Sequence, residues 1–217
     1  LEIVAINDLG DIENLAYLLR HDSVYRDWGH DVSVREGKLI VDGKSIAFIQ
    51  EKDPTKLPWK DLGIDVVVES TGLFETFEKA KVHVVSGAKR VVISAPGKGD
   101  SAQGATVLMG LNEDRLATCT VSSNASCTTN AASPVIAILD ETIGIEKAVL
   151  STAHAYTASQ ELVDAPSKKD MREGRAAAQN IVPTSTGAAT AVAQAYEPLT
   201  GKFDGIALRV PVVAGSI

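Results

Sequence analysis

Short apolar runs alternate with amphipathic segments over the first half of the chain. The run at 1–6 is typical of a buried parallel strand, and the apolar residues between 12 and 19 recur at helical spacing. A helix at 74–85 is expected between strands at 65–69 and 90–93. Strands that alternate with helices over short connections predict a doubly wound α/β sheet.

A hairpin is expected inside this alternation. Asp42-Gly43 stands between apolar runs at 39–41 and 46–49, and this dipeptide is a strong signal for a tight turn between antiparallel strands. Val32 and Val34 alternate with polar residues just before it. The predicted sheet therefore carries an antiparallel insertion.

The alternation of apolar and amphipathic segments ends after residue 139. A polar stretch at 157–180 is too long for an ordinary connection inside a compact domain, and loops of that length are usually functional. We place a domain boundary just before Cys127, between domains at 1–126 and 127–217. The other expected elements are strands at 106–109 and 119–121 before the boundary, and, after it, strands at 148–153 and 206–213. A helix that follows the cysteine motif and carries the apolar pattern 131–139, and a second helix at 187–195, are also expected.

Composition and charge exclude several classes of protein. With 217 residues, of which 45% are hydrophobic and 23% charged, the chain can bury a sizeable core. No apolar run reaches about 18 residues, so no membrane span is expected. The net charge of −7 argues against nucleic acid as the primary partner. Only two cysteines are present and no signal peptide precedes the first strand, so we expect a reducing, cytoplasmic location.

The ends of the sequence lack the features of complete termini. The chain starts without Met inside an expected strand and ends at 212–217 without a closing element. We therefore expect it to be a piece of a longer protein.

Cys127 is the leading candidate for chemistry. It stands in the polar, small-residue stretch 123–130, which runs directly into the apolar pattern of an expected helix. A thiol beside the positive end of a helix, among hydroxyl and amide donors, is favoured as the nucleophilic thiolate. The alternative is an inert structural cysteine, for which the apolar surroundings of Cys119 are more typical.

Three polar positions follow expected strands, at the edge where ligands bind in open α/β sheets: Asp8, Thr71-Gly72 and Ser94. Asp8 is the type of residue that binds the ribose hydroxyls of a dinucleotide, although the glycine-rich turn that would precede it is not in the chain. Each position is also compatible with turn or helix-cap chemistry.

His154 and Arg209 occupy expected strands of the second half. His154 could serve a thiol as a base, or it could be a satisfied core histidine. Arg209 interrupts an otherwise apolar strand, so its guanidinium needs a phosphate or carboxylate ligand or an internal acid. The other histidines, His21, His30 and His83, are interpreted as surface residues.

An anion site is also predicted in this half. Thr186-Gly187 opens an expected helix and offers a hydroxyl and free amides. Together with Thr128 and Thr157 these residues make a credible phosphate site. No Cys-x-x-Cys or His-x-x-x-His spacing is present, so no metal site is predicted.

The motifs together resemble one enzyme family in order along the whole chain. The stretch Ser-Asn-Ala-Ser-Cys-Thr-Thr-Asn at 123–130 resembles the highly specific cysteine motif of the phosphorylating glyceraldehyde-3-phosphate dehydrogenases. The other matching segments lie at 5–9, 21–24, 52–54, 69–74, 92–96, 154–157, 175–183, 185–189 and 209–211.

The resemblance implies a fold in two parts. Residues 1–126 would form a partial Rossmann-type NAD-binding domain that lacks its first strand and glycine-rich turn. Residues 127–217 would form part of an α+β catalytic domain without its C-terminal portion. Ala131 stands where many members carry a second cysteine, which the chemistry does not require.

The resemblance also implies an NAD-dependent, phosphorylating aldehyde dehydrogenase of glycolysis and gluconeogenesis. Cys127 would attack the aldehyde of D-glyceraldehyde 3-phosphate, and His154 would take the proton as hydride leaves for the nicotinamide. Inorganic phosphate would then cleave the thioester to give 1,3-bisphosphoglycerate.

Binding roles follow from the same resemblance. Asp8 and the pair Ala165-Pro166 favour NAD over NADP. The loop at 157–180 resembles the family's subunit-interface loop, which suggests a homotetramer. The implied contacts are Ser126, Thr128, Thr186 and Gly187 to the attacking phosphate, Thr157 and Arg209 to the substrate phosphate, Asp8 to the ribose, and Lys52, Thr71, Gly72 and Ser94 along the cofactor.

Two alternative functions stay open. The first is a dehydrogenase for a longer sugar phosphate such as erythrose 4-phosphate, which would release the acid by hydrolysis. The second is a non-catalytic scaffold or secondary RNA-binding protein that kept the fold. The scaffold hypothesis predicts decay of Cys127, His154 or Arg209, and all three are intact.

Overall fold

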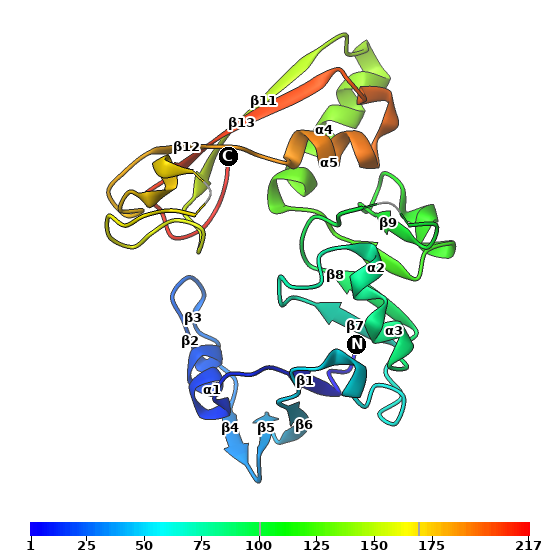
Figure 1. Ribbon diagram of the computed structural model, residues 1–217, viewed down its shortest axis with the longest axis vertical. Coiled ribbons are helices and arrows are strands. Elements are labelled where there is room, and N and C mark those ends of the chain that lie inside the picture. Colours follow the sequence, from blue (N-terminus) through cyan, green and yellow to red (C-terminus); the bar gives the residue numbers. More distant parts are fainter. Residues whose placement is uncertain (100, 169) are drawn as a thin grey trace. The chain divides into compact units, whose positions relative to one another are not determined.

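The computed structural model describes residues 1–99, 101–168 and 170–217 (Figure 1). It divides into two compact units, which we call the first unit (residues 1–67 and 82–90) and the second unit (residues 68–81 and 91–217). The predicted domain boundary at Cys127 stays a prediction. No helix in the described part of the chain is long and apolar enough to cross a membrane.

The first unit contains one four-stranded sheet, in the order β1-β6-β5-β4. Strand β1 pairs with β6 in parallel, whereas β4, β5 and β6 form an antiparallel meander. Asp42 and Gly43 both have positive φ, 49° and 77°, as a two-residue hairpin turn requires. The predicted antiparallel insertion is confirmed. The strands are β1 (Ala5–Asn7), β4 (Val32–Arg35), β5 (Lys38–Val41) and β6 (Lys44–Ile49).

Helix α1 (Ile12–Arg20) covers this sheet, close to the predicted bounds. Asp11 caps it by accepting a hydrogen bond from the backbone N–H of Asn14. Ala16 packs on Val32 and Leu39, which makes a small core. The two-residue strands β2 (His21–Asp22) and β3 (Arg26–Asp27) were not predicted, because too few residues alternate there to give a strand pattern.

A second core in the first unit forms around Trp59. The indole N–H of Trp59 donates to Nδ1 of His83 at 3.1 Å, and both side chains are about 5% exposed. The interpretation of His83 as a surface residue is therefore wrong. The misreading arose because the charged residues that flank the helical segment masked its buried face. The elements around this core are η1 (Pro54–Lys56) and α3 (Val82–Val85).

The second sheet has the order β7-β8-β10-β9, with β10 parallel to both of its neighbours. Strand β10 (Val121–Ser123) begins two residues later than predicted, and β9 (Gly104–Thr106) replaces the strand expected at 106–109. Val107 and Leu108 are buried in the loop that follows β9, so their apolar character reflects loop packing. Strands β7 (Val66–Glu69) and β8 (Arg90–Ile93) lie close to their predicted positions.

The single helix predicted at 74–85 is wrong. Two short helices stand there, α2 (Phe77–Ala80), capped by the hydroxyl of Thr76, and α3. Three of the four residues of α3 are valines, whose β-branched side chains disfavour the helix and weaken its continuation.

The third sheet has the order β11-β13-β12. Strand β11 (Ala148–Ala155) runs parallel to β13 (Phe203–Val210) over their full lengths, and β12 (Val182–Thr184) is antiparallel to β13. β12 was not predicted because Pro183 stands at its centre, and a proline argues against a strand. Helices α4 (Cys127–Ile143) and α5 (Ala188–Ala195) lie side by side (Figure 1), and Ile136 packs on Val192 between them.

The architecture is therefore mixed α/β, and parallel strand pairs recur in all three larger sheets. The predicted class of fold is confirmed. Because the carboxyl ends of parallel strands lie at one edge of a sheet, the loops that follow β8 and β10 lie at one edge of the second sheet, where ligands bind in folds of this class. The stretch 157–180 is irregular apart from η3 (Met171–Gly174), and Lys169 within it lies outside the described residues.

Candidate active site

A tight turn between β10 and α4 presents Cys127. The hydroxyl of Ser123, which is fully buried, donates to the carbonyl of Ala95 at 2.7 Å and accepts from the backbone N–H of Ala125 at 3.0 Å. Ala125 has φ 55°, the left-handed region that is costly for a residue with a Cβ. The turn is thus fixed by hydrogen bonds that offset a strained residue.

Helix α4 starts at Cys127 itself. Ser126 caps the helix, and its hydroxyl accepts from the backbone N–H of Thr129 at 3.1 Å. Asn130 reaches back and donates to the carbonyls of Asn124 and Ser126 at 2.7 and 2.9 Å. Cys127 is exposed and occupies the first helical position, where the partial positive charge of the helix end favours an anionic sulfur.

His154 contacts the thiol directly. Its Nε2 lies 3.1 Å from Sγ of Cys127, across 27 residues of sequence. The histidine stands near the carboxyl end of β11, so the pair joins a helix start to a strand end. Thr128, which is buried, brings its hydroxyl oxygen to 4.0 Å from the same sulfur. The structure therefore brings together a thiol, an imidazole and a hydroxyl.

Arg209 lies on the other side of the imidazole. Because β11 and β13 pair in parallel with His154 opposite Arg209, both side chains leave the same face of the sheet. Nη1 of Arg209 is 2.5 Å from Nδ1 of His154 and 3.2 Å from the carbonyl oxygen of Ala155. That carbonyl is also 2.7 Å from Nδ1.

The neighbours of Nδ1 restrict the state of the imidazole. A guanidinium only donates and a carbonyl only accepts, so Nδ1 either accepts from Arg209 or donates to Ala155. In the first state the ring is neutral and Nε2–H points at the sulfur of Cys127. In the second, Nδ1 carries a proton, and the ring is either a cation with an Nε2–H beside the sulfur or neutral with a bare Nε2. An Nε2–H can stabilise a thiolate, and a bare Nε2 can accept a proton.

Arg209 also has spare donor capacity. Its Nε is buried and without a hydrogen-bond partner among the described residues, and no carboxylate pairs with its guanidinium there. A buried donor left unpaired costs about 1–3 kcal/mol, which an anion at this position would offset. Of the alternatives predicted for Arg209, an internal acid is not found among the described residues, and an anionic ligand fits the unpaired Nε.

The remaining predicted anion residues have well-defined local geometry. The hydroxyl of Thr186 accepts from the backbone N–H of Ala188 at 3.1 Å. Gly187 itself provides no side-chain cap, so the first-turn amides after that of Ala188 remain available to an anion. The hydroxyl of Thr157 is 3.1 Å from that of Ser159, at the exposed start of the long loop.

Gly72 and Ser94 line one cavity of about 210 Å³ at the carboxyl ends of β7 and β8. Glu69 lies at its wall, 4% exposed, and accepts from the backbone N–H of Thr71 at 2.7 Å and from its hydroxyl at 2.5 Å. Gly72 has φ 74°, which suits the sharp bend after β7. Of the three residues predicted in these two loops, Gly72 and Ser94 therefore line the hollow, and Thr71 is held next to Gly72 by Glu69.

Asp8 and Lys52 belong to the first unit, so only their local surroundings are described. They follow the carboxyl ends of the paired parallel strands β1 and β6. One oxygen of Asp8 accepts from the backbone N–H of Gly10 at 2.7 Å, and the carboxylate is exposed. The helix cap is Asp11, so Asp8 is left with an oxygen for a ligand.

Several supporting residues were not predicted from the sequence. Ser123 and Asn130 hold the turn that carries Cys127, and Glu69 holds the predicted cofactor residue Thr71. A polar side chain directly beside a candidate motif is the only sequence signal they give. Among the described residues, no group of three or more His, Cys, Asp or Glu is placed to hold a metal ion.

Comparison with known proteins adds two family matches. Residues 1–77 match the family described as glyceraldehyde 3-phosphate dehydrogenase, NAD binding domain. Residues 126–217 match glyceraldehyde 3-phosphate dehydrogenase, C-terminal domain.

Individual relatives are similar over nearly the whole chain. Glyceraldehyde-3-phosphate dehydrogenase B of Aspergillus oryzae is 48% identical over 97% of the chain, and the enzyme of Streptomyces coelicolor is 48% identical over 100%. The chain spans 62% and 64% of these two relatives, respectively. A protein of the same name from Atlantibacter hermannii is 47% identical, and the chain covers 71% of it.

Proposed function

The chain belongs to the glyceraldehyde-3-phosphate dehydrogenase family, and on that premise we propose that the whole protein converts D-glyceraldehyde 3-phosphate to 1,3-bisphosphoglycerate with NAD and inorganic phosphate. The single observation that carries the proposal is the 3.1 Å contact between Sγ of Cys127 and Nε2 of His154. An exposed thiol that meets an imidazole at a helix start is built for covalent catalysis.

Cys127 supplies the nucleophile. Its thiolate attacks the aldehyde carbon, the C–S bond forms, and the carbonyl oxygen becomes the oxyanion of a hemithioacetal. The Nε2–H of His154 stabilises the thiolate before this step. The protonated ring then passes this proton to the oxyanion, so that the hemithioacetal carries a hydroxyl and Nε2 is left unprotonated, with Nδ1–H donating to the carbonyl of Ala155. The amides at the start of α4 lie beside the reacting carbon and favour the developing negative charge.

His154 then acts as the general base. It accepts the hydroxyl proton of the hemithioacetal at Nε2 while the hydrogen on carbon leaves as hydride, and a thioester on Cys127 results. NAD supplies the hydride acceptor when it is bound. Accepting a proton requires an unprotonated Nε2, so the Arg209 and Ala155 contacts at Nδ1 decide how readily the base forms.

The anion residues fit the two phosphates of the reaction. Ser126, Thr128, Thr186 and Gly187 hold the inorganic phosphate that attacks the thioester, and Thr157 and Arg209 hold the phosphate of the substrate. The unpaired Nε of Arg209 and the uncapped start of α5 support these roles. Hydroxyls and amides orient the attacking oxygen without neutralising it, since neither carries a charge.

The residues assigned to the cofactor fit its groups. The exposed carboxylate of Asp8 has an oxygen available for the ribose hydroxyls and would repel a 2′-phosphate, so NAD is preferred over NADP. Gly72 and Ser94 line a hollow of about 210 Å³, and Thr71 is fixed beside them by Glu69. Lys52 is assigned to the same surface by its place after β6.

We also assign a homotetramer and a cytoplasmic location. Leu162, Val163 and Met171 in the long loop are 78%, 69% and 91% exposed, which suits a segment that a neighbouring subunit covers. Cys119 and Cys127 are both free thiols, as expected in a reducing compartment. Sedimentation analysis of Leu162→Glu, compared with the parent, tests the assembly, because a charge at the interface should dissociate it.

Formation of NADH tests the function. The purified protein with glyceraldehyde 3-phosphate, NAD and phosphate should raise absorbance at the NADH band, and Cys127→Ser should abolish this rate. Cys119→Ser is the matched control and should keep it, since Cys119 is buried away from the turn. Activity in Cys127→Ser equal to that of the parent would refute the mechanism.

Phosphate dependence separates the alternative dehydrogenase. A protein that oxidises erythrose 4-phosphate without phosphate and releases the acid would belong to the hydrolytic alternative. We expect a phosphate or arsenate requirement, because the uncapped start of α5 and the Thr186 hydroxyl form an anion site without an evident role in hydrolysis.

A further inference from the structure

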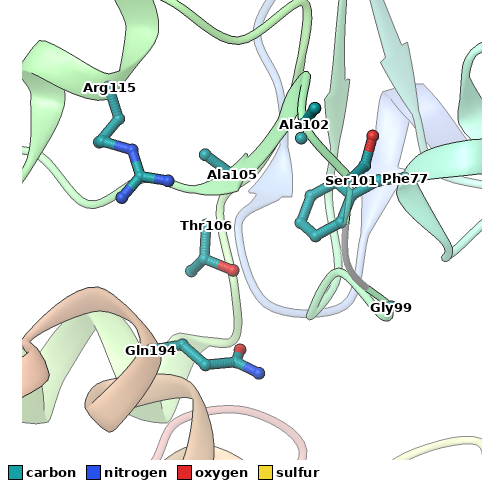
Figure 2. Close-up of a pocket in the computed structure, with 9 residues that line it drawn as sticks. Phe77, Gly99, Ser101, Ala102, Ala105, Thr106, Arg115 and Gln194 are labelled. Carbon is teal, nitrogen blue, oxygen red and sulfur yellow. The ribbon is translucent and has the colours of Figure 1, made fainter.

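A second cavity, of about 400 Å³, opens in the second unit near β9. Four elements supply its walls: α2 with Phe77, β9 with Thr106, η2 (Glu113–Ala117) with Arg115, and α5 with Gln194. Figure 2 shows Arg115, Thr106 and Gln194 on one side of the hollow and the Phe77 ring across from them. No residue assigned above to the reaction lines it.

Arg115 gives the cavity its charge. Among the described residues that line it, Arg115 is the only charged one, and its guanidinium makes no ion pair or hydrogen bond with the described chain. Its backbone is nevertheless fixed, because the carbonyl accepts the N–H groups of Thr118 and Cys119, both at 3.1 Å. Arg115 is exposed, and a cation at a cavity wall with no counter-charge among the described lining residues favours an anionic ligand.

Asn112 sets the spacing between Arg115 and Thr106. Its side-chain amide donates to the carbonyl of Thr106 at 3.0 Å and accepts from the backbone N–H of Leu108 at 2.9 Å. These two bonds tie the residue before η2 to the end of β9. The hydroxyl and the guanidinium are therefore carried by one braced loop, which lowers the entropy lost on binding.

Phe77 provides an apolar wall. The side chain is 6% exposed, and its ring lies directly on β9 because Gly104 has no side chain there. A Cβ on Gly104 would stand 2.5 Å from Cγ of Phe77, which no packing tolerates. The ring therefore bounds the cavity opposite the polar residues and suits a short carbon body.

The donors select the chemistry of the ligand. The guanidinium fork, the Thr106 hydroxyl and the Gln194 amide can donate together to at least three oxygens, and a phosphoryl group presents three. A metal ion is disfavoured because Arg115 repels it. The volume of about 400 Å³ lies near the lower end for small-molecule sites and suits a body of a few carbons.

We propose that this cavity binds a small phosphate monoester, with the phosphoryl group held by Arg115, Thr106 and Gln194 and the carbon body against Phe77. The site does not depend on the proposed reaction, because its residues and those of the reaction do not overlap.

Isothermal titration calorimetry of glycolate 2-phosphate into the full protein tests the proposal. Arg115→Ala should weaken one class of sites by about tenfold or more, because a charge-assisted hydrogen bond is lost. The affinity of Arg115→Lys should lie between those of the parent and Arg115→Ala, because lysine keeps the positive charge but lacks the bidentate guanidinium. Arg35→Ala, which removes an exposed arginine of β4, is the matched control and should bind like the parent.

Two further variants locate the binding. Thr106→Val keeps the shape and removes the hydroxyl, and Gln194→Ala removes the amide; each should weaken the same class of sites several-fold. Circular dichroism confirms that every variant is folded. Isotherms of Arg115→Ala that superimpose on those of the parent overturn the proposal, because phosphate sites of the reaction remain in both.

The ligand series distinguishes the sources of the phosphoryl group. Glycolate without phosphate should not bind to this class of sites, and equal binding would overturn the phosphate assignment. Inorganic phosphate should bind more weakly than glycolate 2-phosphate because it lacks the carbon body. Equal affinities would assign the site to free phosphate and overturn the monoester.

Discussion

Two histidines in different units show how surroundings decide what one side chain does. His83 of the first unit is 5% exposed and accepts the indole N–H of Trp59 on Nδ1. His154 of the second unit is half-buried, and its Nε2 meets a thiol that solvent reaches. The imidazole of His83 completes a buried core, whereas that of His154 can exchange a proton with the thiol beside it. Access to a reactive group, more than the residue type, separates the two.

Removing His154 should give the largest effect. His154→Asn keeps a polar side chain without a base, so the rate of NADH formation should fall by about 10²–10⁴-fold. The urea midpoint of unfolding should change little, because the ring is only half-buried. Activity near that of the parent would show that another group takes the proton.

Alkylation of the thiols gives an independent measure of the same pair. Iodoacetamide near pH 6 should modify Cys127 faster than free cysteine in the parent, because His154 and the helix start favour the thiolate. The reaction should slow in His154→Asn. Cys119 is buried and serves as the internal reference, since it should stay unmodified in both.

Removing His83 should affect stability instead of chemistry. His83→Ala leaves the Trp59 indole N–H without its partner and opens a cavity, so unfolding should become easier by about 2–3 kcal/mol. The NADH rate per folded molecule should stay that of the parent. His21→Ala, at an exposed position, should change the free energy of unfolding by less than about 0.5 kcal/mol. Equal losses for both histidines would contradict the comparison.

An exposed ion pair should give the smallest effect. Hydrogen bonds from the Arg172 guanidinium, and then from its backbone N–H, lower the pKa of Asp170 to about 2. The folded-state pKa is depressed, so this pair stabilises the fold above the ordinary pKa of Asp and ceases to do so as pH falls through about 2. Carboxyl titration by NMR should show the pKa rising toward its usual range in Arg172→Ala.

The sequence predicted elements best where the pattern was local. Strand β8 stands at the predicted residues, and the turn at Asp42-Gly43 follows from two residues alone. The prediction placed strand β9 at 106–109 because Val107 and Leu108 are apolar, but these two side chains are buried in the loop after β9. His83 was misread because burial on a short helix depends on its tertiary neighbour Trp59, which lies 24 residues away.

The candidate site was predictable as residue types but not as a geometry. Cys127 and His154 stand out in the sequence, whereas their 3.1 Å contact depends on how β11 and α4 meet. The contact of Arg209 with the imidazole follows from strand register, which no local pattern reveals. Ser123 and Asn130 escaped notice because their hydrogen bonds reach backbone groups, and any polar side chain can make such bonds.

The pairing of His154 with Arg209 makes the site sensitive to the number of residues in β13. Successive residues of a strand face opposite sides, so one residue inserted into β13 before Arg209 would turn the guanidinium away from the imidazole while leaving the composition almost unchanged. An insertion of the same size in the irregular stretch 157–168 would leave the register of β13 intact. The number of residues in β13 before Arg209 is therefore constrained, whereas the length of the stretch 157–168 is not. Among homologous proteins, insertions and deletions should occur in the stretch and be absent from this part of the strand.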